Sequence, residues 1–477
     1  MAERESQPTR GDCRKSAFSI FAWMICLMLI VTACNPSIED EFGYNGDESD
    51  LEGETHNASG VIKPGKAFDE ACDYDDYQPV TDLFVYDVPA IREPQPRTLF
   101  YDPVFSTCLV RVTDRETEIL PGDNANGLKN EYSRVQSFNA DGSLLLSYST
   151  DGNWYLYDAI SLQPVGQLPI WHEPRWDAVD PDLLYYSEET RLMSYRISNT
   201  QKSLVHEFAD DFPRHNLAAV WMKYEGSPSV DTRYWGLMAE DQGWMTVALL
   251  VYDLQTDTVI SKRMMPPAEI DSVTISPSGQ FFVAYYDNYC EHGQLGSDEQ
   301  PCGLMVYDQD LENGRGLLRI VGHSDLALDA QGNEVLVYQD IDTDTISMVD
   351  LSNGRITPLQ AIDFSHSGIG FHFSGRAFQM PGWALVSTYN GTHPASTWMD
   401  DQIFAIELVK DGRVVRLAHT HSIYNETMDQ DYWAEPHASV NQDFTKIVFT
   451  SNWGRAGTDE VDMYMILLPD NWIASLP

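Results

Sequence analysis

The chain has 477 residues, of which 43% are hydrophobic and 12% aromatic, a composition typical of a folded protein rich in β-structure. Lysine and arginine together number 30 against 73 aspartates and glutamates, which gives a formal net charge of −43. This charge excludes nucleic acids and anionic lipid surfaces as general partners, because both repel an acidic protein.

The first 33 residues have the layout of a secretory signal peptide. Four basic residues precede an uncharged run of 17 residues from Ala17 to Ala33, and a basic start before an apolar stretch is what export signals share. An uncleaved membrane helix is the alternative, since a run of this length barely spans a bilayer. The cysteine that follows the run, Cys34, favours cleavage.

The apolar run ends in Val31-Thr32-Ala33-Cys34. This ending resembles the lipobox of bacterial lipoproteins, in which the preceding peptide is removed and the cysteine is acylated. The resemblance implies lipidation of Cys34 and an exported protein held to a membrane by its lipid, since several acyl chains on one residue anchor firmly. Asn35 favours the outer membrane, and the side of that membrane stays open.

Residues 34–60 are predicted to form a flexible acidic tether. Eight acidic residues lie between Glu39 and Glu54, with few apolar residues among them. A segment of this composition cannot bury enough apolar surface to fold. Residues 61–130 follow as an N-terminal segment of the folded part.

Four cysteines remain once the two in the signal peptide and Cys34 are set aside. An even number in an exported protein favours two disulfides. Cys290 with Cys302 closes a short loop, and Cys72 with Cys108 then fixes the N-terminal segment. Free buried thiols are the alternative.

One pattern recurs seven times in residues 131–477: an apolar strand, a polar turn, a second apolar strand and a third strand. In the first copy these parts are residues 135–138, 139–142, 144–148 and 154–158. The later turns fall at residues 179–182, 230–232, 276–279, 329–332, 374–375 and 441–443. A recurring unit of this kind matches one four-stranded blade per copy. The sequence therefore predicts an all-β fold, a seven-bladed β-propeller.

The stretch from Arg97 to Asp114 lies before the first copy and contains an apolar strand. We expect it to supply the outermost strand of the last blade and so to close the ring. A β-sandwich would not explain seven copies with one order of elements.

The first strand of each propeller blade faces the central channel, so the residues just before each turn are placed to act on a ligand. These residues are Glu131, Tyr132 and Arg134 in copy one, Trp171, His172 and Arg175 in copy two, Tyr224 and Glu225 in copy three, His323 and Asp325 in copy five, His372 in copy six, and Glu435 and His437 in copy seven. Imidazoles and a carboxylate from neighbouring strands can together bind a divalent metal. The alternative for each histidine is an ordinary channel-lining side chain, bonded to water or to carbonyl groups.

Three short motifs carry a resemblance to a known family. They are Gly322-His323-Ser324-Asp325, Phe371-His372-Phe373-Ser374-Gly375 and Glu435-Pro436-His437-Ala438-Ser439. These motifs resemble the channel motifs of oligogalacturonate lyases, seven-bladed propellers of the polysaccharide lyase type. The resemblance implies that His372, Glu435 and His437 bind a divalent metal ion, with manganese, calcium and zinc all open because Glu435 stands where the family has a histidine.

The same resemblance implies β-elimination at a uronate. His323 takes the position of the proton-abstracting base, Arg134 or Arg376 would neutralise the sugar carboxylate, and Tyr132 could protonate the leaving oxygen. The expected partner is a polysaccharide or cell-surface glycan, with Trp171, His172, Arg376 and Trp433 as the residues that would bind it. The net charge of −43 opposes such a polyanion unless the channel mouth is locally positive.

A second class of function stays open, in which the propeller is not an enzyme. It would bind glycans or proteins at the outer membrane through Tyr, Trp and acidic residues on one face, without a metal. A serine protease is disfavoured, because the chain contains no Gly-x-Ser-x-Gly motif.

Overall fold

The computed structural model describes residues 68, 71–75, 77–390, 395–424 and 429–476. The chain divides into residues 1–62 and 63–477, and every described residue belongs to the second unit. The predicted signal peptide, Cys34 and the tether of residues 34–60 lie outside the described residues. Among the residues described, no helix is long and apolar enough to cross a membrane.

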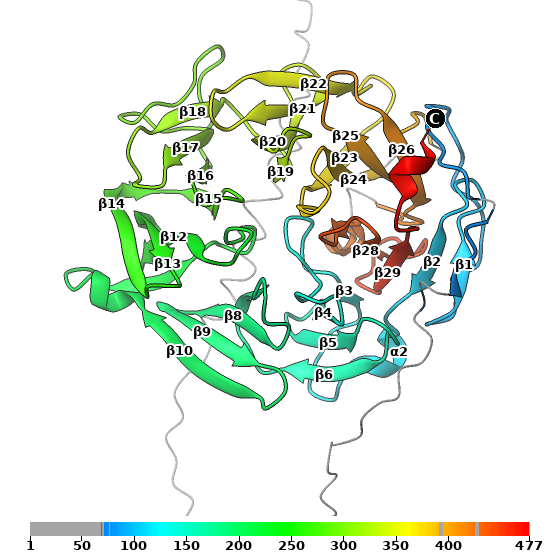
Figure 1. Ribbon diagram of the computed structural model, residues 1–477, viewed down its shortest axis with the longest axis horizontal. Coiled ribbons are helices and arrows are strands. Elements are labelled where there is room, and N and C mark those ends of the chain that lie inside the picture. The colour runs from blue at the N-terminus through cyan, green and yellow to red at the C-terminus, as the bar shows by residue number, and fades with distance from the viewer. Residues whose placement is uncertain (1–67, 69–70, 76, 391–394, 425–428, 477) are drawn as a thin grey trace, which may run out of the picture. The chain divides into compact units, whose positions relative to one another are not determined.

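Seven antiparallel sheets form a ring around a central axis (Figure 1). Six of these sheets have four strands and one has five. The predicted all-β class and the seven blades are confirmed. Within the described residues, the helical elements are α2 (Arg115–Glu118), η2 (Phe208–Asp211), η3 (Asp429–Ala434) and η4 (Trp472–Ser475).

The strands follow one another blade by blade along the chain. Blades one to three consist of β3 (Leu128–Lys129), β4 (Leu144–Ser149), β5 (Trp154–Asp158), β6 (Pro164–Leu168), β7 (His172–Trp176), β8 (Leu183–Glu188), β9 (Arg191–Arg196), β10 (Gln201–Glu207), β11 (Leu217–Trp221), β12 (Tyr234–Asp241), β13 (Thr246–Asp253) and β14 (Thr258–Ala268). Blades four to six consist of β15 (Ile270–Ile275), β16 (Phe281–Tyr286), β17 (Leu304–Asp308), β18 (Arg315–Leu318), β19 (Ser324–Leu328), β20 (Glu334–Asp340), β21 (Thr345–Asp350), β22 (Ile356–Ala361), β23 (Ile369–Ser374), β24 (Trp383–Asn390), β25 (Gln402–Glu407) and β26 (Val414–His419). Blade seven consists of β27 (Ser439–Val440), β28 (Lys446–Ser451), β29 (Asp462–Leu467), β2 (Cys108–Arg111) and β1 (Leu99–Tyr101).

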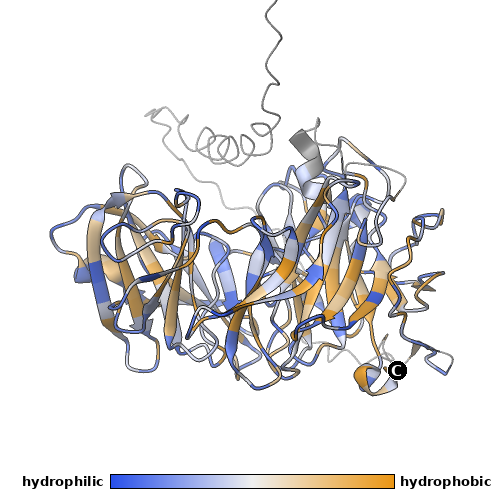
Figure 2. Ribbon diagram, turned by 90° about the horizontal axis from the view of Figure 1, so that it is seen from above, coloured by the Kyte–Doolittle hydropathy of each residue, from blue (hydrophilic) through white to orange (hydrophobic). Residues whose placement is uncertain are grey.

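The middle strands of each blade hold the core. Strand β13 is buried along its whole length, whereas the outer strand β14 alternates between exposed and half-buried residues. This difference is expected, because a middle strand has a neighbouring blade on both faces and an outer strand faces water on one side. Figure 2 shows apolar residues gathered on the strands.

The ring is closed by strands from both ends of the described chain. Strand β2 pairs with β29, with Cys108 opposite Leu467, and β1 adds a fifth strand outside β2. Both strands come from residues 97–114, where the sequence predicts the closing strand. The sheet therefore joins the N-terminal segment to the last blade.

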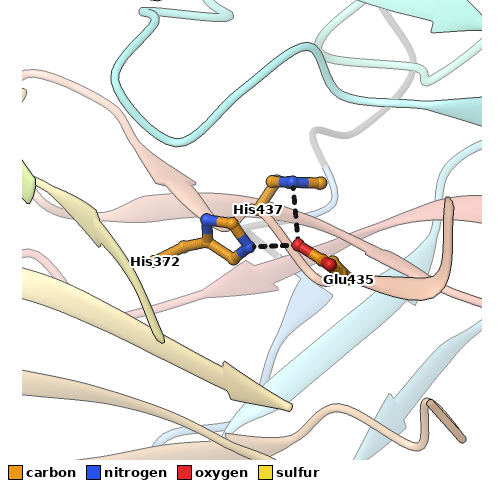
Figure 3. A group of neighbouring side chains, drawn as sticks. All are labelled: His372, Glu435 and His437. Atoms are coloured by element: carbon orange, nitrogen blue, oxygen red, sulfur yellow. Dashed lines mark hydrogen bonds and ion pairs between the residues drawn. The ribbon is translucent and has the colours of Figure 1, made fainter. Parts of the chain in front are cut away.

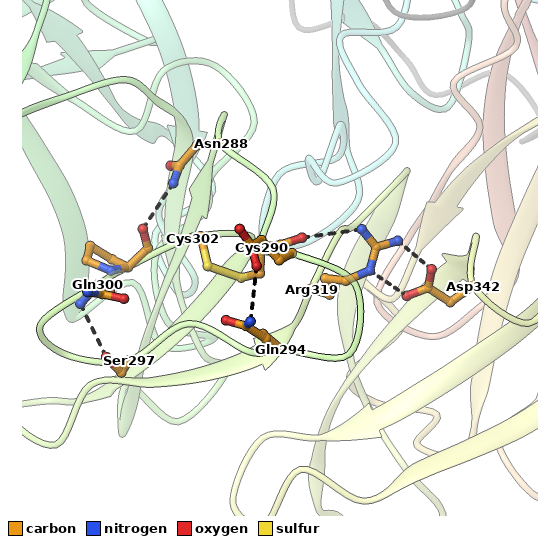
Figure 4. The surroundings of a disulfide bond; sticks show 10 residues. Asn288, Cys290, Gln294, Ser297, Gln300, Cys302, Arg319 and Asp342 are labelled. Carbon is orange, nitrogen blue, oxygen red and sulfur yellow. Dashed lines mark hydrogen bonds and ion pairs between the residues drawn. A yellow bond between two sulfur atoms is a disulfide. The ribbon is translucent and has the colours of Figure 1, made fainter. Parts of the chain in front are cut away.

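Both predicted disulfides are present. Cys72 is bonded to Cys108 of β2, and Cys290 is bonded to Cys302. The second bond closes a surface loop between β16 and β17, where Arg319 donates a hydrogen bond to the carbonyl oxygen of Cys290 at 3.4 Å (Figure 4).

The first blade differs from its prediction. Residues 135–138 are not a strand; only Phe138 forms an isolated bridge, to Leu145, and the inner strand β3 lies earlier, at residues 128–129. The reason is a turn, in which the amide of Val135 donates to the carbonyl of Tyr132 at 3.1 Å. The turn interrupts the inner strand between β3 and Phe138.

Residues 77–107, called the strap below, contain β1 of blade seven and also contact the outer strand of blade six. Val80 bridges to Arg416 of β26, and the carboxylate of Asp102 accepts hydrogen bonds from the backbone amide of His419 at 2.9 Å and from its Nδ1 at 2.8 Å. His421 stacks on Trp453 with ring centroids 4.2 Å apart. These two histidines therefore lie in the packing around the strap.

Candidate functional site

Three side chains from blades six and seven converge in the channel (Figure 3). His372 lies on β23, Glu435 follows η3, and His437 stands just before β27. His372 Nε2 and Glu435 Oε2 are hydrogen-bonded at 2.8 Å, and His437 Nε2 lies 3.5 Å from the same oxygen. One ligand atom from each residue falls within 4.8 Å of the others. The structure therefore brings together the three residues that the sequence proposes as metal ligands.

Three of the four histidine ring nitrogens of this cluster are buried without a hydrogen-bond partner among the described residues. Neither Nδ1 of His372 nor either ring nitrogen of His437 makes a hydrogen bond to any described residue. Leaving a buried polar group unsatisfied costs about 1–3 kcal/mol, so such atoms call for an explanation. Their chemistry fits a divalent metal, because imidazole nitrogens and a carboxylate oxygen are common ligands of zinc and manganese.

The protonation of the cluster is compatible with metal binding. Burial lowers the pKa of His372 and of His437 well below the usual value, so both rings are neutral and carry free lone pairs. Burial raises the pKa of Glu435 to about 7, although the charges of His323 and Lys129 act in the opposite direction. A bound cation would favour the ionised form of Glu435.

His323 and Tyr132 lie beside the cluster. The ring of His323 is 4.4 Å from that of His372, and the ring of Tyr132 is 4.9 Å from that of His437. Tyr132 Oη and His323 Nδ1 are hydrogen-bonded at 3.1 Å. If His323 Nδ1 is the donor, its Nε2 keeps a free lone pair, as a base requires.

Burial shifts the pKa values of these two residues in opposite directions, so that His323 is neutral and Tyr132 is protonated. Burial lowers the pKa of His323 to about 3, which keeps the ring neutral but makes it a weak base. Burial also raises the pKa of Tyr132 well above its usual value, so this hydroxyl keeps its proton. Tyr132 therefore holds a proton but is a weak acid, and both residues need a change of surroundings to act as a strong acid and a strong base.

Arg134 and Arg376 do not present free charges to a ligand, in contrast to the prediction. Arg134 forms an ion pair with Glu225 at 2.8 Å, and Arg376 is paired with Asp325, to which its Nε donates at 3.0 Å. Both arginines are buried. Each pairs with a carboxylate from another blade, so their guanidinium groups link blades of the ring and are already neutralised by a carboxylate.

The predicted sugar-binding residues separate into two places. Trp433 lies near the cluster, 5.7 Å from Lys129 Nζ. Trp171 and His172 lie at the start of β7, with ring centroids 5.9 Å apart, and the Trp171 side chain is 49% exposed. Trp171 is the more accessible to a glycan.

Around Trp171 and His172 the structure adds two aromatic residues that the sequence did not point to, Trp221 and Trp244. His172 contacts Trp221 at 6.1 Å, and Trp221 contacts the 45% exposed Trp244 at 5.9 Å between ring centroids. The aromatic surface, as it is called below, comprises Trp171, His172, Trp221, Tyr224 and Trp244. Trp244 lies in the turn after β12, a place where no repeat position predicts a ligand contact.

Two further channel residues also escaped the sequence reasoning. Tyr389 on β24 stacks on His372 with centroids 5.4 Å apart, and Lys129 on β3 acts electrostatically on Glu435. Tyr389 comes from the second strand of its blade, so the inner-strand rule could not find it. Lys129 lies two residues before Glu131. The one signal in the sequence that could have pointed to it is that basic residues are few in this acidic chain.

No family model and no curated protein matches the chain. Among solved structures, the oligogalacturonate lyase of Vibrio parahaemolyticus is similar, with 13% sequence identity, coverage of 82% of this chain and 99% of that chain, and a TM-score of 0.53. Hydrazine synthase of Kuenenia stuttgartiensis covers 72% of this chain and 98% of its own, with 12% identity and a TM-score of 0.41. The resemblance to lyase-type propellers is confirmed at the level of the fold.

Proposed function

We propose that this protein is a metal-dependent polysaccharide lyase that cleaves uronate-containing glycans by β-elimination. The observation that carries the proposal is the meeting of His372, Glu435 and His437, with three buried ring nitrogens that have no hydrogen-bond partner among the described residues. The similar fold of a protein named as an oligogalacturonate lyase supports the choice of reaction.

The reaction assigns one proton transfer to each of two residues. His323 Nε2 accepts the proton from C5 of the uronate, and the electron pair left behind forms the C4–C5 double bond as the C4–O bond breaks. Tyr132 gives its proton to the leaving oxygen and recovers one from His323 Nδ1, to which it is hydrogen-bonded at 3.1 Å. The products together hold every atom of the substrate, so no water or oxidant is needed.

A divalent metal held by His372, Glu435 and His437 would supply Lewis acidity toward the uronate carboxylate. This matters because the C5 proton is weakly acidic until the carboxylate charge is neutralised. Metal identity stays open among manganese, calcium and zinc, since two nitrogens and one oxygen suit more than one of them.

We propose further that the protein is exported and anchored in the outer membrane by a lipid on Cys34, with residues 34–60 as the tether. The motif at Val31-Thr32-Ala33-Cys34 is the support for this. Labelling cells with a palmitate analogue would test it: Cys34→Ser should lose the label and leave the membrane fraction, and a labelled variant would contradict lipidation at this residue.

A non-catalytic glycan-binding propeller is the second candidate. Two observations favour it: the cluster is buried, with His437 0% exposed, and the exposed aromatic surface offers a place for sugar rings. In this case the aromatic surface would bind glycan without chemical change.

Metal content and product formation together separate the two candidates. The mature protein and a His372→Ala/His437→Ala variant are compared by elemental mass spectrometry, and both are assayed on uronate polysaccharides for ultraviolet-absorbing unsaturated ends. The lyase proposal expects one metal ion per chain, lost in the double variant, and no product from His323→Ala. The exposed His366 provides a matched control as His366→Ala. If the protein stays metal-free in the presence of added divalent salts, the lyase proposal is contradicted and the non-catalytic glycan-binding propeller is favoured.

A further inference from the structure

The basic side chains of the channel differ in one respect, which is whether a carboxylate neutralises them. Among the described residues, four basic side chains form an ion pair there: Arg134 with Glu225 at 2.8 Å, Arg175 with Glu131 at 3.1 Å, Lys223 with Glu240 at 3.3 Å, and Arg376 with Asp325. Lys129 has no ion pair with any residue that the structure describes. In a chain of net charge −43, a buried cation without a carboxylate partner is unexpected.

Lys129 is held in place by its strand. It is the second residue of β3, pairs with Tyr148 of β4, and is 2% exposed. Its ammonium group donates one hydrogen bond, to the carbonyl oxygen of Glu131 at 3.0 Å, and lies 5.7 Å from the centre of the Trp433 ring. An ammonium group has three donors, so two hydrogens of this one are not used by the described residues.

Such an arrangement is costly unless a ligand completes it. A buried charge is normally paired or fully hydrogen-bonded, because transfer from water without compensation costs several kcal/mol. The surrounding fold compensates only in part: Glu435 and Glu131 attract the ammonium group without a direct ion pair, and the ring of Trp433 contributes a weaker attraction than an ion pair. The paired arginines and Lys223 show that the same channel neutralises its other cations.

Lys129 is also close to the metal cluster. Its charge acts on His372, Glu435 and His437, which places the ammonium group within electrostatic range of all three. Burial lowers the pKa of Lys129 to about 8, and the ammonium form still predominates at pH 7. A sugar bound at the cluster would therefore meet a positive charge on one side and the face of Trp433 beside it.

We propose that Lys129 binds the carboxylate of an acidic sugar in the channel, with Trp433 against the sugar ring. This inference rests on the proposed function. It assigns recognition of the substrate carboxylate to Lys129 and not to Arg134 or Arg376, which are already paired with carboxylates. Lys129 is a binding residue here, since no proton transfer is assigned to it. The ligand class follows from the proposed function: the single carboxylate of a uronate would supply the ion-pair partner that Lys129 does not have among the described residues.

The experiment measures binding without turnover. Metal-free full-length mature protein is titrated calorimetrically with trisaccharides of galacturonate, glucuronate, mannuronate and guluronate, and with the methyl ester of whichever binds. Lys129→Met should lower the affinity for the acidic trisaccharide about tenfold to a hundredfold, as expected for the loss of a hydrogen bond to a charged group. The affinity for the methyl ester should stay unchanged. Lys129→Arg should restore part of the loss, and Lys410→Met, at an exposed lysine, should have no effect.

Two results would overturn the inference: failure of all four acids to bind, or equal weakening of acid and ester in Lys129→Met. Circular dichroism and the melting temperature establish that each variant is folded. The test is separate from that of the proposed function, because it uses no metal and no product. If the protein binds acidic sugars through Lys129 but yields no unsaturated product, this inference holds and the lyase proposal is contradicted.

Discussion

Oε2 of Glu435 lies 2.8 Å from Nε2 of His372, and this same oxygen is the carboxylate atom nearest to His437, at 3.5 Å. One oxygen thus faces two imidazoles from different blades, and the second distance is too long for a good hydrogen bond. Two neutral rings and a carboxylate arranged in this way could supply three ligands to a metal ion. The contact also explains why Glu435, a departure from the family motif, is compatible with a metal.

Divalent metal should stabilise the protein through this contact. A ligand that binds only the folded state at a hundred times its Kd adds about 2.7 kcal/mol to the free energy of unfolding. We expect thermal unfolding with and without chelator to show an increase in Tm with manganese or zinc, and His372→Ala/His437→Ala to abolish it. His366→Ala is the control and should show the same increase in Tm as the wild type. If the double variant also shows this increase, the metal binds elsewhere.

The aromatic surface should contribute to glycan binding independently of the metal. Trp171→Ala and Trp244→Ala remove exposed rings, 49% and 45% accessible, and each loss should weaken oligosaccharide binding by about tenfold, the scale of an aromatic contact. Val179→Ala, at an apolar side chain that is 83% exposed, is the matched control. Affinity electrophoresis in polysaccharide gels measures the effect, and equal mobility of all variants would contradict a sugar-binding role for this surface.

The two disulfides should differ in their contribution to stability. The bond Cys72–Cys108 spans 36 residues and Cys290–Cys302 spans 12. On the chain-entropy view, closing loops of these lengths is worth about 4 and about 3 kcal/mol. Urea unfolding of Cys72→Ala/Cys108→Ala should therefore show the greater loss, since it also releases β2 from the segment before it. If removal of Cys290–Cys302 lowers the free energy of unfolding more, native contacts at that disulfide outweigh loop entropy.

The fold could be predicted from the sequence because each blade is specified locally. Turns such as the one that ends at Gly279, with φ of 80°, recur between apolar strands, and seven such units have no other way to bury their faces. The comparable placement of His323, His372 and His437 before their turns also indicated that they meet. Residues 135–138 were misassigned, because an apolar run does not reveal the turn at Tyr132.

The partners of the channel cations could not be predicted. Whether Arg134 is free or paired depends on the distance to Glu225, which lies in another blade and 91 positions along the chain. Sequence patterns specify what each strand presents to the channel but not which opposite side chain it meets. The charge of Lys129 is informative only after the pairing of its neighbours is known.

The protein should lose stability in acid, and His421 should account for a measurable part of the loss. Its ring is 8% exposed and stacked on Trp453, and burial lowers the pKa of His421 to about 4, with the charge of His419 acting in the same direction. The unfolded chain binds this proton at about pH 6.5. The unfolded state therefore takes up more protons between pH 6.5 and 4, so stability is complete above this window and falls as the pH is lowered through it.

Replacing the ring isolates this contribution from that of the other buried histidines. In urea unfolding between pH 4 and 6.5, the wild type should lose up to about 1.4 kcal/mol per pH unit more than His421→Gln, which corresponds to one proton. His366→Gln, at an exposed histidine, should follow the wild type. Parallel curves for wild type and His421→Gln would mean that the folded protein accepts a proton at His421 as readily as the unfolded chain, and that the packing around the strap opens to water in acid.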